Sequence, residues 1–445
     1  MKRPSLSLAL AATALAANLA HAQNVWQPNA NNGAQVWSNP AQWSAGVPGP
    51  ASDVQIPAGA PTLDVNAQIG SLTIQNNGGV RGTKNLTVTG STSLQNIAVH
   101  ATSIDAETGG VFSLGTLTNF SNGILSGNYT CNHSAAQFAP TTVQFRGANV
   151  TELDGEIYLF GSGALIRDQD SGLNAFRNLA VVRPNALFYL EDAPPHTTSG
   201  NLSNRGDFLI YDSLNATATT YTVNGSLTNT DNGYLEAYGN SQITVKGNLL
   251  NATTGPQGEI YVSNNGAVPT GEAILSVDGD LTNQMGSEIT VEGYGERRAR
   301  LIVKGAMTNN GEVTLMGSGS LEVAGVLTVA PDSILNLIGT NATETFTMTA
   351  KRIDAAAGSA FGARGTIFAD LVEHGVFYPG ASPGRVTING SVAFGSTASL
   401  QFEIGGVTAG TNYDQVVQQS TGTGGVTLGG NLALILVNDF ENTIQ

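Results

Sequence analysis

The sequence predicts an all-β fold, specifically a parallel β-solenoid, and three observations carry this prediction. Of the 445 residues 55 are Gly, while aromatic residues make up only 7% and charged residues 11%. This composition is typical of short strands joined by tight turns, not of amphipathic helices. A chain of this length exceeds one ordinary compact core. Finally, a short motif with a central glycine recurs along the chain at intervals typical of solenoid rungs.

The recurring motif has the form V-x-G-x-(L/M)-x-N. It occupies residues 223–229, 245–251, 277–283 and 303–309, and a fifth copy at 323–329 lacks the final Asn. The central glycines lie 22, 32, 26 and 20 residues apart. One such unit cannot bury its apolar side chains alone, but units stacked by parallel pairing align them into continuous internal ladders. The repeat therefore predicts stacked rungs.

Alternation along one copy predicts which side chains face the core. In an extended chain Val277, Gly279 and Leu281 share the inner side, whereas Asp278 and Asp280 share the outer side. The Asn that ends each copy is expected either to adopt a left-handed turn or to hydrogen-bond to the Asn of the next rung. About fifteen rungs at ~4.8 Å each would make a rod roughly 70 Å long.

A meander or sandwich of hairpins is the alternative fold. Asn-Gly pairs at 232–233 and 310–311 are typical of two-residue hairpin turns. The regular register of the repeat favours the solenoid over this alternative.

The N-terminus predicts export. Lys2 and Arg3 precede an apolar run over 6–17, and Ala20-His21-Ala22 is a small-x-small cleavage site, so residues 1–22 are interpreted as a cleaved signal peptide. We expect the mature protein to be secreted or displayed on the bacterial cell surface. No other stretch has the apolar length of a membrane-spanning helix, so we expect none in the mature chain.

Residues 23–70 are interpreted as a cap on the first rung. The three tryptophans of the chain, Trp26, Trp37 and Trp43, all lie in this segment, in a stretch rich in Asn, Pro and Gly. A solenoid exposes unpaired strands and core at its ends, and large rings can cover them. The alternative is that the rings form a platform on which sugars stack.

Both ends of the chain contain further recognisable stretches. Near the N-terminus these are the tryptophans, Gly46-Val47-Pro48, Asp53, Gly59 and 69–74, and near the C-terminus they are 379–384, 402–406, 413–415 and 428–432. They resemble secreted bacterial proteins with autotransporter-like repeats, many of which carry a PEP-CTERM sorting tail.

This resemblance implies an exported β-helical stalk and no particular activity. It implies solenoid repeats over 71–375 and a last passenger-type β segment over 376–445. The chain stops at Gln445 without a Pro-Glu-Pro motif or a series of barrel strands. We therefore expect that the C-terminal anchor is absent, because the segment is truncated or because the protein is released.

Charge and cysteine content exclude some partners and cofactors. The formal net charge is −15, which disfavours binding to nucleic acid. The single cysteine, Cys131, cannot form an intrachain disulfide. Cys131 and His133 have the spacing of a metal-binding pair, but no second pair accompanies them, which argues against a metal site here. We expect no metal and no cofactor.

The segment 152–212 is the candidate region for chemistry, because the repeat fades there while charged residues accumulate. Asp168 and Asp170 are two positions apart, which would place two carboxylates on one side of a strand, as in acid–base pairs that cleave polysaccharides. A solvated strand carrying two carboxylates is the simpler interpretation. The charged residues of the segment are Glu152, Asp154, Glu156, Arg167, Asp168, Asp170, Arg177, Arg183, Glu191, Asp192, Arg205, Asp207 and Asp212.

A basic cluster, Arg297, Arg298 and Arg300, stands out in the acidic chain. The simpler interpretation is a loop between rungs, neutralised by Glu292 and Glu296. The alternative is a contact for an acidic glycan.

These observations favour a structural or adhesive protein over an enzyme. The export signal and the repeat are strong features, whereas no residue set forms a strong catalytic, cofactor-binding or metal-binding constellation. We expect weak binding to glycans or to components of a cell surface or matrix. The alternative function is a polysaccharide-processing β-helix enzyme, a lyase or a hydrolase.

Overall fold

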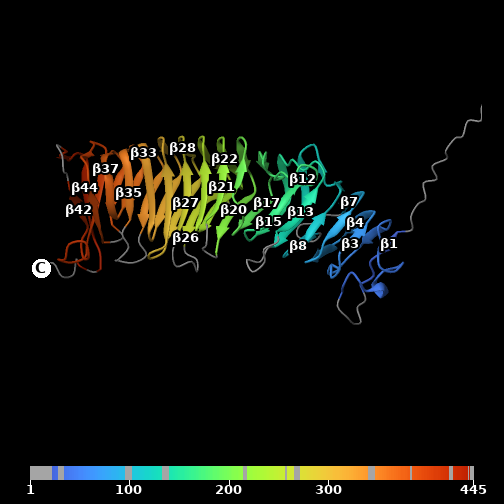
Figure 1. Cartoon of the computed structure of the whole chain (residues 1–445). Helices are drawn as coiled ribbons and strands as arrows, with labels where there is room; N and C mark the ends of the chain where they lie inside the picture. Colours follow the sequence, from blue (N-terminus) through green and yellow to red (C-terminus); the bar gives the residue numbers. More distant parts are fainter. Residues whose placement is uncertain are drawn as a thin grey trace, which may run out of the picture.

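The chain forms an elongated rod of stacked β-strands, seen from the side in Figure 1. The computed structural model describes residues 23–28, 35–95, 103–132, 140–213, 218–255, 258–264, 271–338, 346–380, 383–419, 424–438 and 440. Each coil adds strands to three faces in a fixed order, and the strands of successive coils pair in parallel. The predicted parallel β-solenoid is confirmed.

The first face runs along nearly the whole rod. Its strands are β5 (Gly79–Gly82), β8 (Ser103–Glu107), β12 (Ile124–Asn132), β14 (Glu152–Phe160), β17 (Leu187–Glu191), β20 (Asp207–Asp212), β23 (Tyr234–Gly239), β26 (Glu259–Asn264), β29 (Glu288–Gly293), β32 (Glu312–Met316), β34 (Ile334–Ile338), β36 (Ala360–Ala363), β38 (Val376–Pro379), β41 (Ser399–Ile404) and β44 (Asn431–Leu436).

The second face consists of two successive ladders. The first ladder contains β3 (Ala67–Ile69), β6 (Leu86–Val88), β9 (Val111–Ser113), β13 (Thr141–Phe145) and β15 (Ala164–Asp168). The second contains β18 (His196–Thr198), β21 (Thr219–Val223), β24 (Ser241–Val245), β27 (Glu272–Val277), β30 (Arg298–Val303), the first halves of β33 (Gly319–Val329), β35 (Thr347–Ala355) and β37 (Gly365–Glu373), then β39 (Arg385–Ile388) and β42 (Gln415–Gln418).

The third face closes each coil. It contains β1 (Asn24–Val25), β2 (Asp53–Ile56), β4 (Ser71–Gln75), β7 (Ser91–Gln95) and β10 (Thr116–Leu117), then the start of β12, which pairs with the short antiparallel β11 (Phe120–Ser121), and the start of β14. It continues through β16 (Val181–Val182), β19 (Leu202–Asn204), β22 (Leu227–Asp231), β25 (Leu249–Thr253), β28 (Leu281–Asn283), β31 (Met307–Asn309), the second halves of β33, β35 and β37, β40 (Val392–Phe394) and β43 (Val426–Thr427).

The core is a set of apolar ladders inside the three faces, as the alternation predicts. Val277 and Leu281 are at most 1% exposed, whereas the side chains of Asp278 and Asp280 lie outside. The prediction is wrong for Gly279, which lies at the corner between β27 and β28 and not on the inner side of a strand. The repeat motif therefore spans a corner: its Val ends a second-face strand, and its Leu begins a third-face strand.

The corner glycine leaves room for a side chain of the preceding rung. A Cβ on Gly279 would overlap the side-chain oxygen of Asn248, and Gly305 meets Asp280 in the same way. These side chains are needed there, because Asn248 Oδ1 accepts a hydrogen bond from Asp280 N at 3.0 Å, and Asp280 Oδ1 accepts one from Ala306 N at 2.8 Å. The glycine and the polar residue that follows it are thus two parts of one contact between rungs.

The asparagines that end the motif form a buried ladder. Asn204, Asn229, Asn251, Asn283 and Asn309 are aligned in register and are fully buried. Each side-chain amide donates to the next, at 2.8, 3.1, 2.9 and 2.9 Å in chain order. The hydrogen-bonding prediction is confirmed, and the left-handed alternative is wrong because none of the five has a positive φ.

The three tryptophans close the N-terminal end of the stack. Trp43 packs edge-on against Trp26 and Trp37, with ring centroids 4.9 and 4.8 Å apart, and its indole N–H donates to Trp37 O. All three are at most 4% exposed, so their faces are not open to a sugar. Strands β1, β2 and β3 already belong to the stack, so rung pairing starts within 23–70.

The remaining residues extend the same architecture. Strands β38 to β44 continue all three faces within the described residues between Val376 and Leu436. The 3-10 turn Pro40–Gln42 is the only helical element in the described part of the chain. Among the residues that the structure describes, no helix is long and apolar enough to cross a membrane.

Candidate functional site

The predicted carboxylate pair is wrong, because Asp168 and Asp170 do not share one side of a strand. Strand β15 ends at Asp168, whose side chain points inward and accepts hydrogen bonds from the Ser171 hydroxyl at 2.5 Å and from Asp170 N at 3.3 Å. Asp170 is exposed in the turn that follows. Burial raises the pKa of Asp168, but hydrogen bonds from Ser171 and from backbone amides outweigh it and lower the pKa overall. Asp168 therefore holds a turn.

Several other charges of the segment 152–212 pair with each other at the surface. Arg183 contacts Glu152 at 2.6 Å and Asp154 at 3.4 Å, and Arg205 contacts Asp231 at 2.6 Å. Each of these side chains is at least one-third exposed, so the pairs contribute little to stability. They account for the accumulation of charge without requiring chemistry.

Cys131 is a packing residue. It is fully buried on β12, and its thiol donates to Leu165 O at 3.2 Å. Burial raises the pKa of the thiol to about 12, so it is not a reactive thiolate at neutral pH. Its predicted partner His133 lies outside the described residues. Within the described ranges, no group of three or more His, Cys, Asp or Glu side chains could hold a metal ion.

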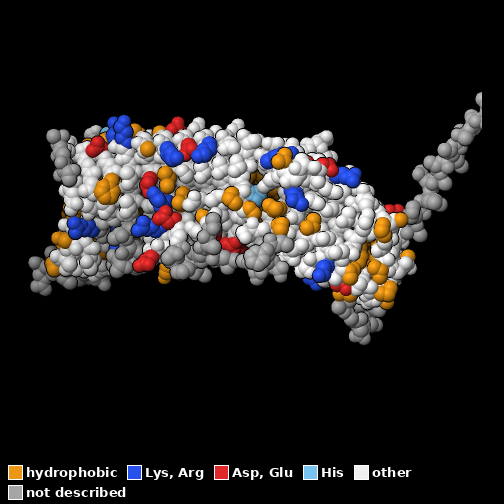
Figure 2. Space-filling view, in the orientation of Figure 1, with side chains coloured by type: hydrophobic (Ala, Val, Ile, Leu, Met, Phe, Trp, Pro, Cys, Tyr) orange, Lys and Arg blue, Asp and Glu red, His pale blue; other side chains and the backbone are white. Residues whose placement is uncertain are grey.

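The basic cluster is not the loop that the sequence predicted. The turn covers Tyr294–Arg297, whereas Arg298 and Arg300 belong to β30, where they flank the buried Ala299 and point outward. Figure 2 shows basic and acidic side chains lying side by side on one side of the rod. Glu292 accepts a hydrogen bond from the hydroxyl of Tyr261, and the salt bridges of Arg298 and Arg300 are made with Glu272 and Glu322.

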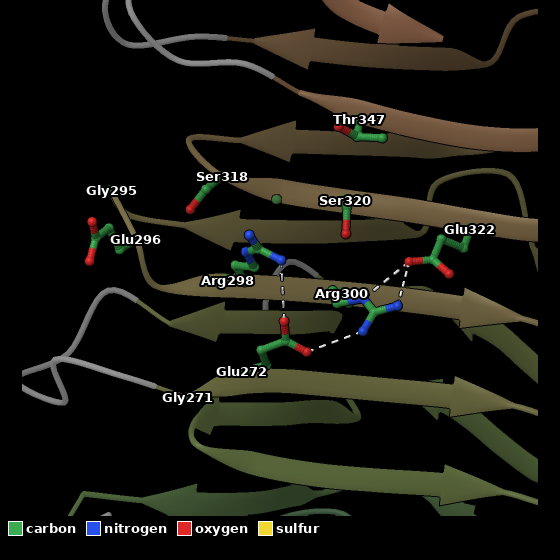
Figure 3. A pocket seen from close by; sticks show the side chains of 11 residues that line it. Gly271, Glu272, Gly295, Glu296, Arg298, Arg300, Ser318, Ser320, Glu322 and Thr347 are labelled. Atoms are coloured by element: carbon green, nitrogen blue, oxygen red, sulfur yellow. Dashed lines mark hydrogen bonds and ion pairs between the residues drawn. The ribbon is translucent and has the colours of Figure 1, made fainter. Parts of the chain in front are cut away.

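The two arginines lie in a groove that we call the arginine groove (Figure 3). Arg300 bridges Glu272 at 3.1 Å and Glu322 at 2.5 Å, so its charge is matched on both sides. Arg298 is 69% exposed and reaches Glu272 only at 3.8 Å. The groove encloses about 840 Å³, and its lining residues are Gly271, Glu272, Gly295, Glu296, Arg298, Arg300, Ser318, Gly319, Ser320, Glu322 and Thr347.

The arginine groove forms because the strands after β30 carry small outward side chains, whereas β30 carries the long side chains of Arg298 and Arg300. Ser320 is the register partner of Arg300 on β33, and Thr347 is the partner of Ser320 on β35, so the outer surface drops beside the guanidinium groups. Hydroxyls, carboxylates and one incompletely paired guanidinium therefore face the same space. Such a mosaic can exchange hydrogen bonds with the hydroxyls of a sugar chain.

A second lateral surface lies on the first face. We call it the tyrosine face and define it as the outward side chains of the first-face strands from β14 to β32. The tyrosine rings of this face follow one another along the rod. The ring centroids are 5.9 Å apart for Tyr158 and Tyr189 and 5.0 Å apart for Tyr189 and Tyr211. Tyr211 stacks on Tyr238 with ring centroids 4.7 Å apart. Parallel register places Tyr158 beside Tyr189 and Tyr211 beside Tyr238. The step from Tyr189 to Tyr211 is diagonal, because the register partner of Tyr189 is Leu209, two positions before Tyr211.

Carboxylates alternate with these rings and are ordered by them. The hydroxyl of Tyr189 donates to Glu191 at 2.7 Å, and the hydroxyl of Tyr211 donates to Glu236. Burial raises the pKa of Glu236, Glu259 and Asp207, although tyrosine or threonine hydroxyls partly offset this for the two glutamates. Carboxyl groups with raised pKa values, set among aromatic rings, are typical of functional surfaces as well as of structural ones.

Sequence reasoning missed the tyrosine face. The signal was present as alternation in short stretches such as 156–160, 187–191 and 234–238, where at least two of the three alternate positions are Tyr or Glu. These stretches lie outside the V-x-G motif, and their spacing is irregular. Only the observed register shows that they are stacked.

Comparison with known proteins gives no relative from which a role could be transferred. No known family matches the chain, and no curated protein of similar sequence was found.

Proposed function

We propose that the chain is an exported structural or adhesive protein, a rod of the cell envelope or extracellular matrix. The observation that carries this proposal is the long stack of parallel strands on three faces, which presents long lateral faces with repeated groups. Many weak contacts along such a face sum to strong attachment. The charged N-terminus followed by an apolar run supports export.

The arginine groove supports glycans as partners of the rod. A glycan offers hydroxyls that can pair with Ser320, Thr347 and Glu272, and an acidic sugar would add a carboxylate for the exposed Arg298. Tyr294, which is 63% exposed, lies in the turn next to the groove and offers a ring face for stacking.

Gene deletion with complementation tests the adhesive role. We expect the deletion strain to lose surface attachment and matrix formation, and the wild-type gene to restore both. A Val277→Asp gene should fail because it disrupts a rung, whereas Asp278→Asn, its outward neighbour, should restore attachment. Unchanged attachment in the deletion strain, together with loss of an extracellular enzyme activity, would contradict the proposal.

A polysaccharide-processing enzyme is the second candidate, favoured by the raised pKa of Glu236 and Glu259 on the tyrosine face, since a general acid must hold its proton near neutral pH. The purified mature chain should be incubated with acidic and neutral glycans, with and without calcium. Cleavage that Glu236→Gln abolishes would replace the adhesive proposal. No turnover with any of these glycans would support it.

A further inference from the structure

The tyrosine face carries acidic side chains but no basic ones on its strands. The first-face strands from β14 to β32 contain no Lys or Arg, and each carries at least one outward carboxyl group. The ion pairs described above involve the other faces or the corners. A surface of this kind repels anions and attracts cations.

One row of the tyrosine face is especially regular. Asp207, Tyr234, Glu259, Glu288 and Glu312 are direct register partners on successive strands. Asp207 and Glu288 are exposed, and the other three are half-buried. In this row Glu259, Glu288 and Glu312 follow one another one strand spacing apart, ~4.8 Å, along the rod axis. Asp207 is two strand spacings from Glu259, because Tyr234 lies between them.

These acidic groups are held in place without a basic partner. No salt bridge joins Asp207, Glu259, Glu288 or Glu312 to a basic side chain among the described residues. Glu288 and Glu312 instead accept hydroxyl hydrogen bonds from Thr290 and Thr314, both at 3.3 Å. Neighbouring carboxylates in the row repel one another, and a polycation bound along the row would reduce this repulsion.

The tyrosine rings near the acidic row indicate which class of cation could bind there. Tyr234 lies within the acidic row. Tyr211, Tyr238 and Tyr261 lie on β20, β23 and β26, the strands that carry the first three members of the row. Tyrosine rings attract ammonium groups and pack against the C–H groups of sugars. Sequence-specific peptides are recognised through pockets for individual side chains, whereas a ladder of repeated groups suits a polymer of identical units.

We propose that the tyrosine face binds an extended polysaccharide whose sugars carry free amino groups. The inference rests on the proposed adhesive function and names its ligand class. The ammonium groups pair with Asp207, Glu259 and Glu288, while the sugar rings lie against Tyr211, Tyr238 and Tyr261. The polymer runs parallel to the rod, so that successive sugars meet successive rungs.

Binding of a matched pair of oligomers tests this inference. The purified mature chain is titrated calorimetrically with a soluble β-1,4-linked glucosamine oligomer and with its N-acetylated counterpart of equal length. We expect binding of the glucosamine oligomer that weakens as salt rises, and much weaker binding of the neutral one. Equal affinity for both, or tighter binding of polylysine than of glucosamine, would overturn the proposal.

Variants locate the site. Because each substitution removes one charge pair with the polymer, Asp207→Asn combined with Glu259→Gln should weaken glucosamine binding by about tenfold. Asp354→Asn, on the third face, is the matched control and should bind like the wild type. Equal affinities of the double variant and the control would overturn the assignment, provided that circular dichroism shows both folded.

The same variants separate this inference from the proposed function. A double variant that loses glucosamine binding but restores attachment to the deletion strain would overturn the link between this site and adhesion, and would leave an adhesive rod. The purified protein could also bind glucosamine oligomers while the deletion strain attaches as well as the wild type. That pair of results would support the binding site and contradict the adhesive function.

Discussion

The side-chain amide of Asn251 donates to Oδ1 of Asn283 at 2.9 Å, across two rungs whose asparagines are 32 residues apart. The same Asn251 amide donates to Glu288 O at 2.9 Å, and Asn251 Oδ1 accepts from Asn229. Each asparagine thus joins its own rung to the next one and also fixes the corner that leads to the first face. Such a buried polar chain is stabilising only while every member is satisfied.

Replacing one member should therefore be costly. Asn251→Leu leaves the amide of Asn229 without one acceptor and Glu288 O without one donor, so we expect a loss of roughly 1–3 kcal/mol in the free energy of unfolding. Thr282→Ala, an outward change on the adjacent strand, should cost at most about 0.5 kcal/mol. Thermal melting of both variants measures the difference. Equal effects would mean that the ladder does not stabilise the stack.

Substitutions at inward positions of a rung should destabilise the protein far more than substitutions at outward positions. Val277→Asp buries an unpaired carboxylate in a ladder of apolar groups, which costs several kcal/mol or prevents folding. Asp278→Asn loses the ion pairs with Lys246 at 3.2 Å and Lys304 at 2.6 Å, which are partly exposed, so we expect about 1 kcal/mol or less. Circular dichroism melts decide, and similar losses for the two variants would contradict the assigned orientation.

The corner glycine can be tested by a double-mutant cycle. In Gly279→Ala the new Cβ overlaps Asn248 Oδ1, so we expect destabilisation. Asn248→Ala removes that overlap but also removes the acceptor for Asp280 N, so the double variant should lose less than the sum of the single losses. Gly200→Ala, where a Cβ meets open space, is the control and should be nearly neutral. Additive losses in the cycle would show that the two residues are independent.

Glu373 should make stability depend on pH. It lies two rungs beyond Val329, at the register position of the asparagine ladder, and burial raises its pKa from 4.5 to about 8 although backbone amides partly offset this. The folded state therefore holds a proton that the unfolded state has lost between pH 4.5 and 8. Stability contributed by this group is complete below pH 4.5 and falls by up to ~1.4 kcal/mol for each pH unit up to pH 8.

Glu373→Gln removes this titration. We expect the variant to lose less stability than the wild type between pH 5 and 8 in urea unfolding, with the difference increasing over that window. Other carboxyl groups with raised pKa values affect both proteins equally, so the difference isolates Glu373. Parallel pH profiles for the two proteins would show that Glu373 does not titrate in this window.

The sequence by itself determined the solenoid, because the V-x-G-x-(L/M)-x-N copies repeat inner and outer positions that only stacking can satisfy. It also determined the inward placement of Val277 and Leu281, and it offered the pairing of one asparagine with the next as one of two alternatives. These features are local patterns, because the residue types and their alternation along a short stretch indicate which side chains are buried.

Only the tertiary structure decided which residues share a surface. The distance in sequence from Tyr189 to Tyr238 gives no hint that both belong to one ladder, because coils differ in length and register is set by pairing across them. The same holds for Arg300, whose partners Glu272 and Glu322 come from the rungs before and after it. Asp168 and Asp170 are two positions apart in sequence yet do not share one side of a strand, because the strand ends at Asp168 and its last side chain turns inward to hold the turn.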